Sequence, residues 1–135
     1  MKGFEINFLD HVAIRVRDME ASAAWYNKVL GLKIVKIPEW GDFPVFLFAG
    51  QSGIALFPAN EEDSPIDPKS RNVKIDHYAF NVSRENFEKA QDHLDSLSIE
   101  YEIKDHTHFH SLYMKDPDNH TVELTTLISD PDQVY

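Results

Sequence analysis

Hydrophobic and polar residues alternate in two short segments that begin in almost the same way. Residues 9–16 read LDHVAIRV and residues 75–82 read IDHYAFNV, with their histidines 66 positions apart (77 − 11 = 66). Alternation with a period of two is typical of a strand with one buried face. The pattern predicts two equivalent strands that carry His11 and His77 on the face opposite the large apolar side chains.

A helical segment follows each predicted strand, and strand-like runs follow each helix. Asp18 is a suitable N-cap for a helix that reaches Leu30 and ends at Gly31, and Ser83 is the N-cap of a second helix that runs to about Leu97. The runs rich in β-forming residues are 33–37, 43–49 and 54–57 in the first half and 99–104, 111–115 and 121–126 in the second. Each half therefore has the predicted order βαβββ.

These elements predict an α+β fold with two repeated modules, at about residues 7–58 and 73–128, within one domain of 135 residues. Residues 59–72 are polar and contain prolines, so we expect them to form the linker between the modules. Residues 116–119 (DPDN) suit a tight turn that joins the last two strands as a hairpin.

Composition excludes several classes of function. The formal charge is −10, from 23 acidic and 13 basic residues, and no Lys/Arg cluster offsets it, so we expect no binding to nucleic acid or to membranes. The absence of cysteine excludes disulfides, thiolate metal sites and cysteine nucleophiles. The N-terminal residues form no apolar leader, and the longest apolar run, Val45–Ala49, is too short to cross a bilayer. We therefore expect a cytoplasmic protein.

The two histidines become a metal-site candidate if the modules pack about a pseudo-two-fold axis. On the last predicted strand, Glu123 alternates with Val122 and Leu124, so it faces away from the apolar side and reaches the same cavity. Taken alone, a strand histidine is usually structural and a glutamate is usually solvated. Together, neutral imidazoles and a carboxylate suit Fe(II), Mn(II), Zn(II) or Ni(II), and three protein ligands leave positions open on the ion.

These segments, together with residues 25–32 (WYNKVLGL) and 111–124 (SLYMKDPDNHTVEL), resemble the vicinal-oxygen-chelate superfamily of glyoxalases, fosfomycin resistance proteins and extradiol dioxygenases. The resemblance covers nearly the whole chain. It implies a cupped mixed sheet, built from the two modules, around one divalent metal ion bound by His11, His77 and Glu123. It also implies a small-molecule substrate with vicinal oxygens and a homodimer. The cup would close within one chain or by exchange of modules between two chains.

The resemblance also ranks the branches of the family. Lactoylglutathione lyases take a fourth ligand from the strand at residues 53–58, which here contains no acid or amide. Fosfomycin thiol transferases carry a threonine where this chain has Ala13. Extradiol dioxygenases place a tyrosine ten residues before the glutamate, as Tyr113 is here (123 − 113 = 10). We therefore expect an extradiol-dioxygenase-like oxidoreductase with Fe(II) on a catechol-like substrate. Fosfomycin-type thiol transfer, glyoxalase-like lyase or isomerase activity, and metal-free drug binding stay open as alternatives.

Residues 105–110 (DHTHFH) supply candidates for a catalytic histidine near Tyr113. By its spacing from Tyr113, His108 matches the extradiol pattern best and His106 is second, although a solvated loop or an adventitious metal site has a similar composition. In the expected mechanism, a loop histidine accepts the substrate's phenolic proton and Tyr113 hydrogen-bonds a substrate oxygen.

Several further residues are candidates for substrate binding. Arg15 and Asn81 occupy equivalent positions (81 − 15 = 66), where Arg15 could orient an anionic group or pair with a neighbouring acid. Ser111 shares a strand face with Tyr113. A set of apolar residues could line a substrate pocket or pack in the core: Phe43, Val45, Phe46, Leu47, Phe48 and Phe57.

Overall fold

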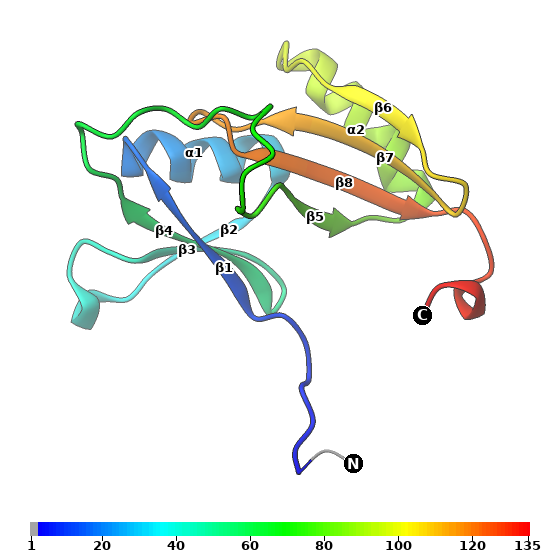
Figure 1. The fold of residues 1–135 in the computed structure, drawn as a ribbon, viewed down its shortest axis with the longest axis horizontal. Helices are drawn as coiled ribbons and strands as arrows, with labels where there is room; N and C mark the ends of the chain where they lie inside the picture. Colours follow the sequence, from blue (N-terminus) through cyan, green and yellow to red (C-terminus); the bar gives the residue numbers. More distant parts are fainter. Residues whose placement is uncertain (1–2) are drawn as a thin grey trace. The chain divides into compact units, whose positions relative to one another are not determined.

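The computed structural model describes residues 3–135 and shows the predicted element order twice. The first module contains β1 (His11–Val16), α1 (Met19–Leu30), β2 (Lys33–Lys36), the short 3₁₀ helix η1 (Pro38–Trp40), β3 (Val45–Ala49) and β4 (Ser52–Pro58). The second contains β5 (Tyr78–Asn81), α2 (Arg84–Ser96), β6 (Glu102–Asp105), β7 (Phe109–Lys115), β8 (Thr121–Leu127) and η2 (Pro131–Gln133) (Figure 1). The α+β fold with two repeated βαβββ modules is confirmed.

The chain divides into two compact units, Met1–Asp63 and Ser64–Tyr135, and each unit contains one four-stranded mixed sheet. The strand order is β1-β4-β3-β2 in the first sheet and β5-β8-β7-β6 in the second. In both, the first strand of the module runs parallel to the last, and the other neighbouring strands are antiparallel. The two modules thus share one topology, which explains the repeat in the sequence.

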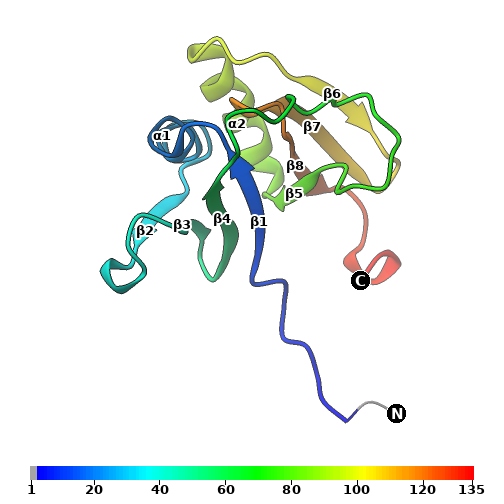
Figure 2. The same cartoon turned by 60° about the vertical axis from the view of Figure 1, so that its left-hand side comes forward.

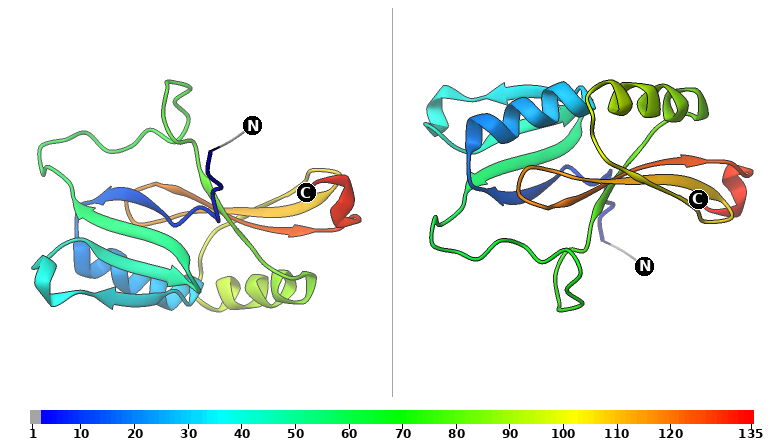
Figure 3. Two further views of the ribbon diagram at one scale, coloured as in Figure 1. Left: turned by 90° about the horizontal axis from the view of Figure 1, so that it is seen from below. Right: turned by 90° about the horizontal axis from the view of Figure 1, so that it is seen from above.

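In the first module, α1 covers one face of the sheet (Figure 3). The Asp18 side chain accepts a hydrogen bond from the backbone N–H of Ala21, and Gly31 ends the helix in the left-handed conformation at φ 70°, as predicted. The side chains between helix and sheet are almost fully buried, and burial of each contributes on the order of 2 kcal/mol. They include Val16, Tyr26, Leu47, Ile54 and Leu56.

The other face of the first sheet carries His11. In the parallel pairing of β1 with β4, His11 lies opposite Gly53 and Arg15 lies opposite Phe57. Phe46 and Phe48 of β3 lie on this face too, because the residues of β4 with which they pair belong to it. Two members of the apolar set, Val45 and Leu47, point toward α1 and belong to the core, whereas Phe46, Phe48 and Phe57 share the face of His11.

In the second module, the Ser83 side chain caps α2 by accepting from the backbone N–H of Asn86, and α2 packs against β8. The core contains Leu94, Leu112, Met114 and Val122. The Asp116 carboxylate accepts hydrogen bonds from the backbone N–H groups of residues 118 and 120, both at 2.9 Å, and Asn119 is left-handed at φ 68°. The predicted hairpin between β7 and β8 is confirmed.

The two histidine strands begin later than the alternation predicts. The first starts at His11, and the chain bends there before continuing toward the N-terminus (Figure 2). The second starts at Tyr78, so His77 precedes it. Within residues 3–135, no helix has the length and apolar character needed to cross a membrane.

Candidate metal centre

The second module brings His77 and Glu123 together. Glu123 lies on β8, where it pairs with Ala79 on β5 and with Tyr113 on β7. The Nε2 atom of His77 lies 3.0 Å from the Oε1 atom of Glu123. Glu123 is only 7% exposed, and a buried carboxylate is stable only where it has hydrogen-bonding or charged partners.

Tyr113 is the second partner of Glu123. Its hydroxyl group donates a hydrogen bond to the Glu123 carboxylate, and its ring meets the ring of His77 edge to face at 5.7 Å. Burial, followed by the hydrogen bond to Glu123 and the charge of that carboxylate, raises the pKa of Tyr113 to about 12. Tyr113 is therefore protonated at neutral pH and acts as a hydrogen-bond donor beside the candidate ligands.

The structure separates the two loop histidines. The Nε2 atom of His106 lies 2.8 Å from the Tyr113 hydroxyl, whereas the Nδ1 atom of His108 lies 2.7 Å from the hydroxyl of Ser129. Since His108 is directed toward the C-terminal segment and His106 toward Tyr113, the geometry favours His106. This order is the opposite of the one that spacing predicted.

The other polar candidates of the second module pair with the residue of β8 that is two positions after Glu123. Ser111 is fully buried, and its hydroxyl group lies 2.8 Å from that of Thr125. Asn81 pairs with Thr125 across β5 and β8 and is exposed. Both residues share the sheet face of Glu123, but the hydroxyl of Ser111 is already engaged within the sheet.

In the first module, His11 lies at the edge of a pair of stacked phenylalanine rings. Its ring meets Phe46 edge to face at 5.3 Å, and Phe46 stacks on Phe48 at 5.0 Å. The guanidinium group of Arg15 lies 5.3 Å from the centre of the Phe57 ring and donates a hydrogen bond to the carbonyl of Pro58 at 3.1 Å. This face offers flat apolar surfaces, a cation and one imidazole.

Two aspartates contact the histidines, and the sequence reasoning assigned them no role. The Nδ1 atom of His11 lies 2.7 Å from Oδ2 of Asp10, and the Nδ1 atom of His77 lies 2.8 Å from Oδ2 of Asp76. The hydrogen bond with His77 lowers the pKa of Asp76. In a regular strand, consecutive side chains point to opposite faces, so alternation does not predict this contact. The repeated Asp-His pair was the available signal.

The donor atoms of the second module fit a divalent ion. Two ligand atoms at about 2.1 Å from an ion, and at right angles to each other, would be about 3.0 Å apart. The His77–Glu123 distance has this value. Among residues 3–135, no group of three or more histidine, aspartate or glutamate side chains is placed to hold a metal ion. The second module thus supplies two of the three predicted ligands, and the first module presents His11 with the same Asp contact on Nδ1.

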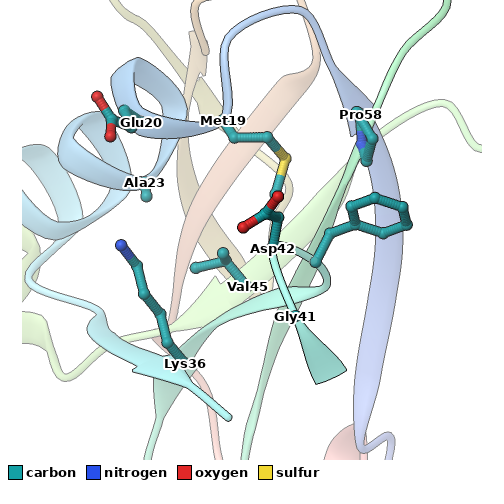
Figure 4. A pocket seen from close by; sticks show the side chains of 9 residues that line it. Met19, Glu20, Ala23, Lys36, Gly41, Asp42, Val45 and Pro58 are labelled. Atoms are coloured by element: carbon teal, nitrogen blue, oxygen red, sulfur yellow. The ribbon is translucent and has the colours of Figure 1, made fainter. Parts of the chain in front are cut away.

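A pocket of about 470 Å³ lies on the other face of the first sheet (Figure 4). Met19 and Ala23 of α1 form one wall, and Lys36 extends from β2 toward the helix. Lys36 pairs with Val45, whose side chain faces α1, so this pocket opens on the side opposite His11. It does not contain the predicted metal ligands.

Comparison with known proteins identifies the family. The model of the Glyoxalase/Bleomycin resistance protein/Dioxygenase superfamily matches residues 8–124, a range that includes all three predicted ligands. The chain belongs to this superfamily. A glyoxalase/dioxygenase from Nostoc punctiforme has the same fold, with a TM-score of 0.80 at 21% identity over 96% of this chain and 97% of that one.

Two curated members of the superfamily match most of this chain. The metallothiol transferase FosB of Lysinibacillus sphaericus is 30% identical over 125 residues, which cover 90% of this chain and 83% of FosB. The glutathione transferase FosA of Serratia marcescens is 27% identical over 116 residues, which cover 86% of this chain and 78% of FosA. The resemblance inferred from the motifs is confirmed, but these relatives are transferases, and neither they nor the family model single out the dioxygenase branch.

Proposed function

We propose that the protein is a divalent-metal-dependent enzyme that binds a small substrate through two adjacent oxygens, with His11, His77 and Glu123 as the metal ligands. The observation that carries this proposal is the buried Glu123 carboxylate, which lies 3.0 Å from His77 Nε2 and accepts a hydrogen bond from a protonated Tyr113. A carboxylate held in this way is suited to act as a ligand, and the single O–H group of Tyr113 would turn from Glu123 to a bound substrate if the carboxylate coordinated the ion.

The first reaction we propose is ring-cleaving dioxygenation of a catechol-like substrate, with Fe(II) as the metal. When bound, the ion would supply Lewis acidity that favours ionisation of the substrate hydroxyl groups. In the proton transfer, the Tyr113 oxygen accepts the proton of a substrate hydroxyl group as Tyr113 passes its own proton to Nε2 of His106, which lies 2.8 Å away and is an acceptor when the proton of His106 is on Nδ1. Tyr113 then donates a hydrogen bond to the substrate oxygen.

The first module supports an aromatic substrate. Phe46 and Phe48 form a stacked pair beside His11, and Phe57 lies under the Arg15 guanidinium group. Flat apolar surfaces bind an aromatic ring by offset or edge-to-face contacts, and an arginine binds an anionic substituent on it. Arg15 and Phe57 therefore keep their proposed substrate-binding role. Asn81, which is exposed on the sheet face of Glu123, keeps it as well, whereas the buried hydroxyl of Ser111 is engaged with Thr125 and would act on a substrate only indirectly.

Thiol transfer of the fosfomycin type is the second candidate, because the two relatives described above are a metallothiol transferase and a glutathione transferase. In this reaction a thiolate would attack an epoxide carbon, the C–S bond would form as the C–O bond breaks, and the resulting alkoxide would take a proton. Tyr113 is the donor that the structure offers for that proton. The residues at the candidate centre serve either reaction, so the assay must decide.

The metal and the reaction are tested in sequence. Purified protein is stripped with a chelator, reconstituted separately with Fe(II) under anaerobic conditions and with Mn(II), Zn(II) or Ni(II), and analysed for bound metal. Each form is then assayed with catechols and oxygen, for coloured ring-cleavage products, and with fosfomycin and glutathione, for loss of free thiol. Failure of every metal to bind would overturn the proposal. Turnover in only the thiol assay would replace the first reaction by the second.

Variants of the two loop histidines test the proton path. His106→Gln is expected to reduce turnover more than His108→Gln, because only His106 contacts Tyr113. A general acid or base contributes about 10²- to 10⁴-fold to a rate, so the two variants are easily distinguished. A larger loss in His108→Gln would restore the order that spacing predicted.

We also propose a homodimer, and mixing experiments decide whether the modules are exchanged in it. His11→Ala and His77→Ala chains each lack one ligand, so neither alone forms a complete site. If His11 of one chain joins His77 and Glu123 of the other, a mixture refolded together regains intact sites. If all three ligands come from one chain, the mixture binds no more metal than either variant alone.

A further inference from the structure

The contact between an aspartate and a histidine occurs twice, at equivalent positions of the two modules. Asp10 Oδ2 lies 2.7 Å from His11 Nδ1, and Asp76 Oδ2 lies 2.8 Å from His77 Nδ1. In both cases the aspartate immediately precedes the histidine and lies outside the regular strand. In the second module the other ring nitrogen, Nε2, faces Glu123.

We propose that Asp10 and Asp76 are positioning residues that orient His11 and His77 for metal binding through Nε2. This inference rests on the proposed function, in which both histidines are ligands. Each carboxylate accepts the hydrogen bond of Nδ1–H, so the proton stays on that nitrogen and the Nε2 lone pair is available. A carboxylate on the far side of a ligating imidazole also fixes the ring orientation and increases its basicity.

The fold does not need these two carboxylates. The side chains of Asp10 and Asp76 are 68% and 71% exposed, and exposed pairs of this kind contribute little to stability. The structural role at position 10 belongs to the backbone, because the carbonyl of Asp10 accepts a hydrogen bond from the N–H of Gly53 at 3.0 Å. A substitution of either side chain therefore tests metal binding without removing a core contact.

The experiment measures Co(II) binding to the full chain by visible absorption, with a competing chelator where binding is tight. The variants are Asp10→Ala, Asp76→Ala and Asp76→Asn, and the control is Asp92→Ala, which removes the same charge from the exposed surface of α2. We expect each alanine variant at position 10 or 76 to weaken Co(II) binding roughly 10- to 100-fold, the usual effect of losing such a partner.

The asparagine variant separates orientation from charge. Its amide oxygen can still accept the hydrogen bond from Nδ1–H, so Asp76→Asn is expected to bind Co(II) more tightly than Asp76→Ala. Far-UV circular dichroism and melting in chelator check that each variant is folded.

The result that overturns the inference is unchanged Co(II) affinity in Asp10→Ala and Asp76→Ala, while His77→Ala loses binding. Equal weakening in Asp92→Ala would assign the effect to net charge, and equal affinities of Asp76→Asn and Asp76→Ala would remove the orienting role. A wild-type chain that binds no Co(II), nor any of the other metals, would overturn the proposed function itself. The two failures are therefore distinguishable.

Discussion

Metal binding should stabilise the folded chain, and the stabilisation should require a ligand from each module. An ion at a free concentration of about 100 times its dissociation constant stabilises the folded state by about 2.7 kcal/mol, if it binds that state alone. For 135 residues at about 2.1 cal/mol/K each, the entropy of unfolding is about 0.28 kcal/mol/K. We therefore expect the melting temperature to rise by about 10 °C.

The perturbation is the removal of one histidine at a time. The side chain of His11 is 39% exposed, so its loss should change the stability of the metal-free chain by about 0.5 kcal/mol or less. The side chain of His77 is 37% exposed but lies 3.0 Å from the buried Glu123 carboxylate, so its loss should cost about 1–3 kcal/mol even without metal. Glu123 keeps Tyr113 as a partner when His77 is removed. In the presence of the metal, by contrast, both His11→Ala and His77→Ala should lose most of the 10 °C rise in melting temperature, because each variant loses most of the stabilisation that metal binding provides.

The assay is thermal unfolding followed by circular dichroism, with and without Mn(II), for the wild-type chain, both variants and His93→Ala. His93 lies in the last turn of α2, so its variant controls for the loss of a histidine elsewhere. A His11→Ala chain that keeps the full rise would show that the second module binds the ion without the first. That result would refute the three-ligand reasoning, although His77 and Glu123 would remain ligands.

Three further predictions concern stability. The folded chain holds the Tyr113 proton up to a pKa of about 12, against about 10 when unfolded, so this stabilisation is present below about pH 10 and is lost between about pH 10 and 12. After allowance for solvent screening, metal-free wild type should lose on the order of 1 kcal/mol more than Tyr113→Phe between about pH 9 and 11 in urea unfolding; equal losses would contradict the assignment. Gly53→Ala should destabilise the first module strongly, because its Cβ atom would lie 2.0 Å from the carbonyl oxygen of Leu47; a normal melting temperature would contradict that geometry. Ser111→Ala should cost about 1–2 kcal/mol by removing the partner of Thr125, and combining it with Thr125→Val should cost less than the sum of the two single changes.

Local signals predicted most of the fold, because they act over a few residues. Asp18 and Gly31 bound the first helix, and Ser83 begins the second, where the sequence placed them. A cap side chain that accepts a hydrogen bond from its own helix depends only on residues close in the sequence, and so does a glycine that ends a helix. Alternation was reliable inside the strands but not at their starts, so it gave no indication of the contacts that Asp10 and Asp76 make.

The loop before β7 shows why the site was harder to predict than the fold. Spacing from Tyr113 treats the chain between the two residues as regular. Thr107 is instead left-handed at φ 72°, a conformation that few non-glycine residues adopt, and the N–H of His108 donates to the carbonyl of His106 at 2.8 Å. The chain turns at this point, so His106 contacts Tyr113 and His108 contacts Ser129.

The repeat also accounts for the predicted number of metal ligands and for the difference between the two modules. Ala79 pairs with Glu123 in the second module, and its equivalent, Ala13 (79 − 66 = 13), pairs with Ala55 in the first. Ala55 therefore stands where Glu123 stands in the other module. The neighbours on the next strand correspond as well, since Phe46 pairs with Ala55 as Tyr113 pairs with Glu123.

A symmetric pair of modules would offer two carboxylates and two hydroxyl donors, which would surround an ion with four protein ligands. With Ala55 and Phe46 in the first module, that side can contribute one imidazole and an apolar aromatic surface. The second module keeps the carboxylate, the protonated tyrosine and a histidine that contacts it. Under the proposed function, divergence at these two register positions leaves the first module with residues for substrate contact and the second module with residues for proton transfer.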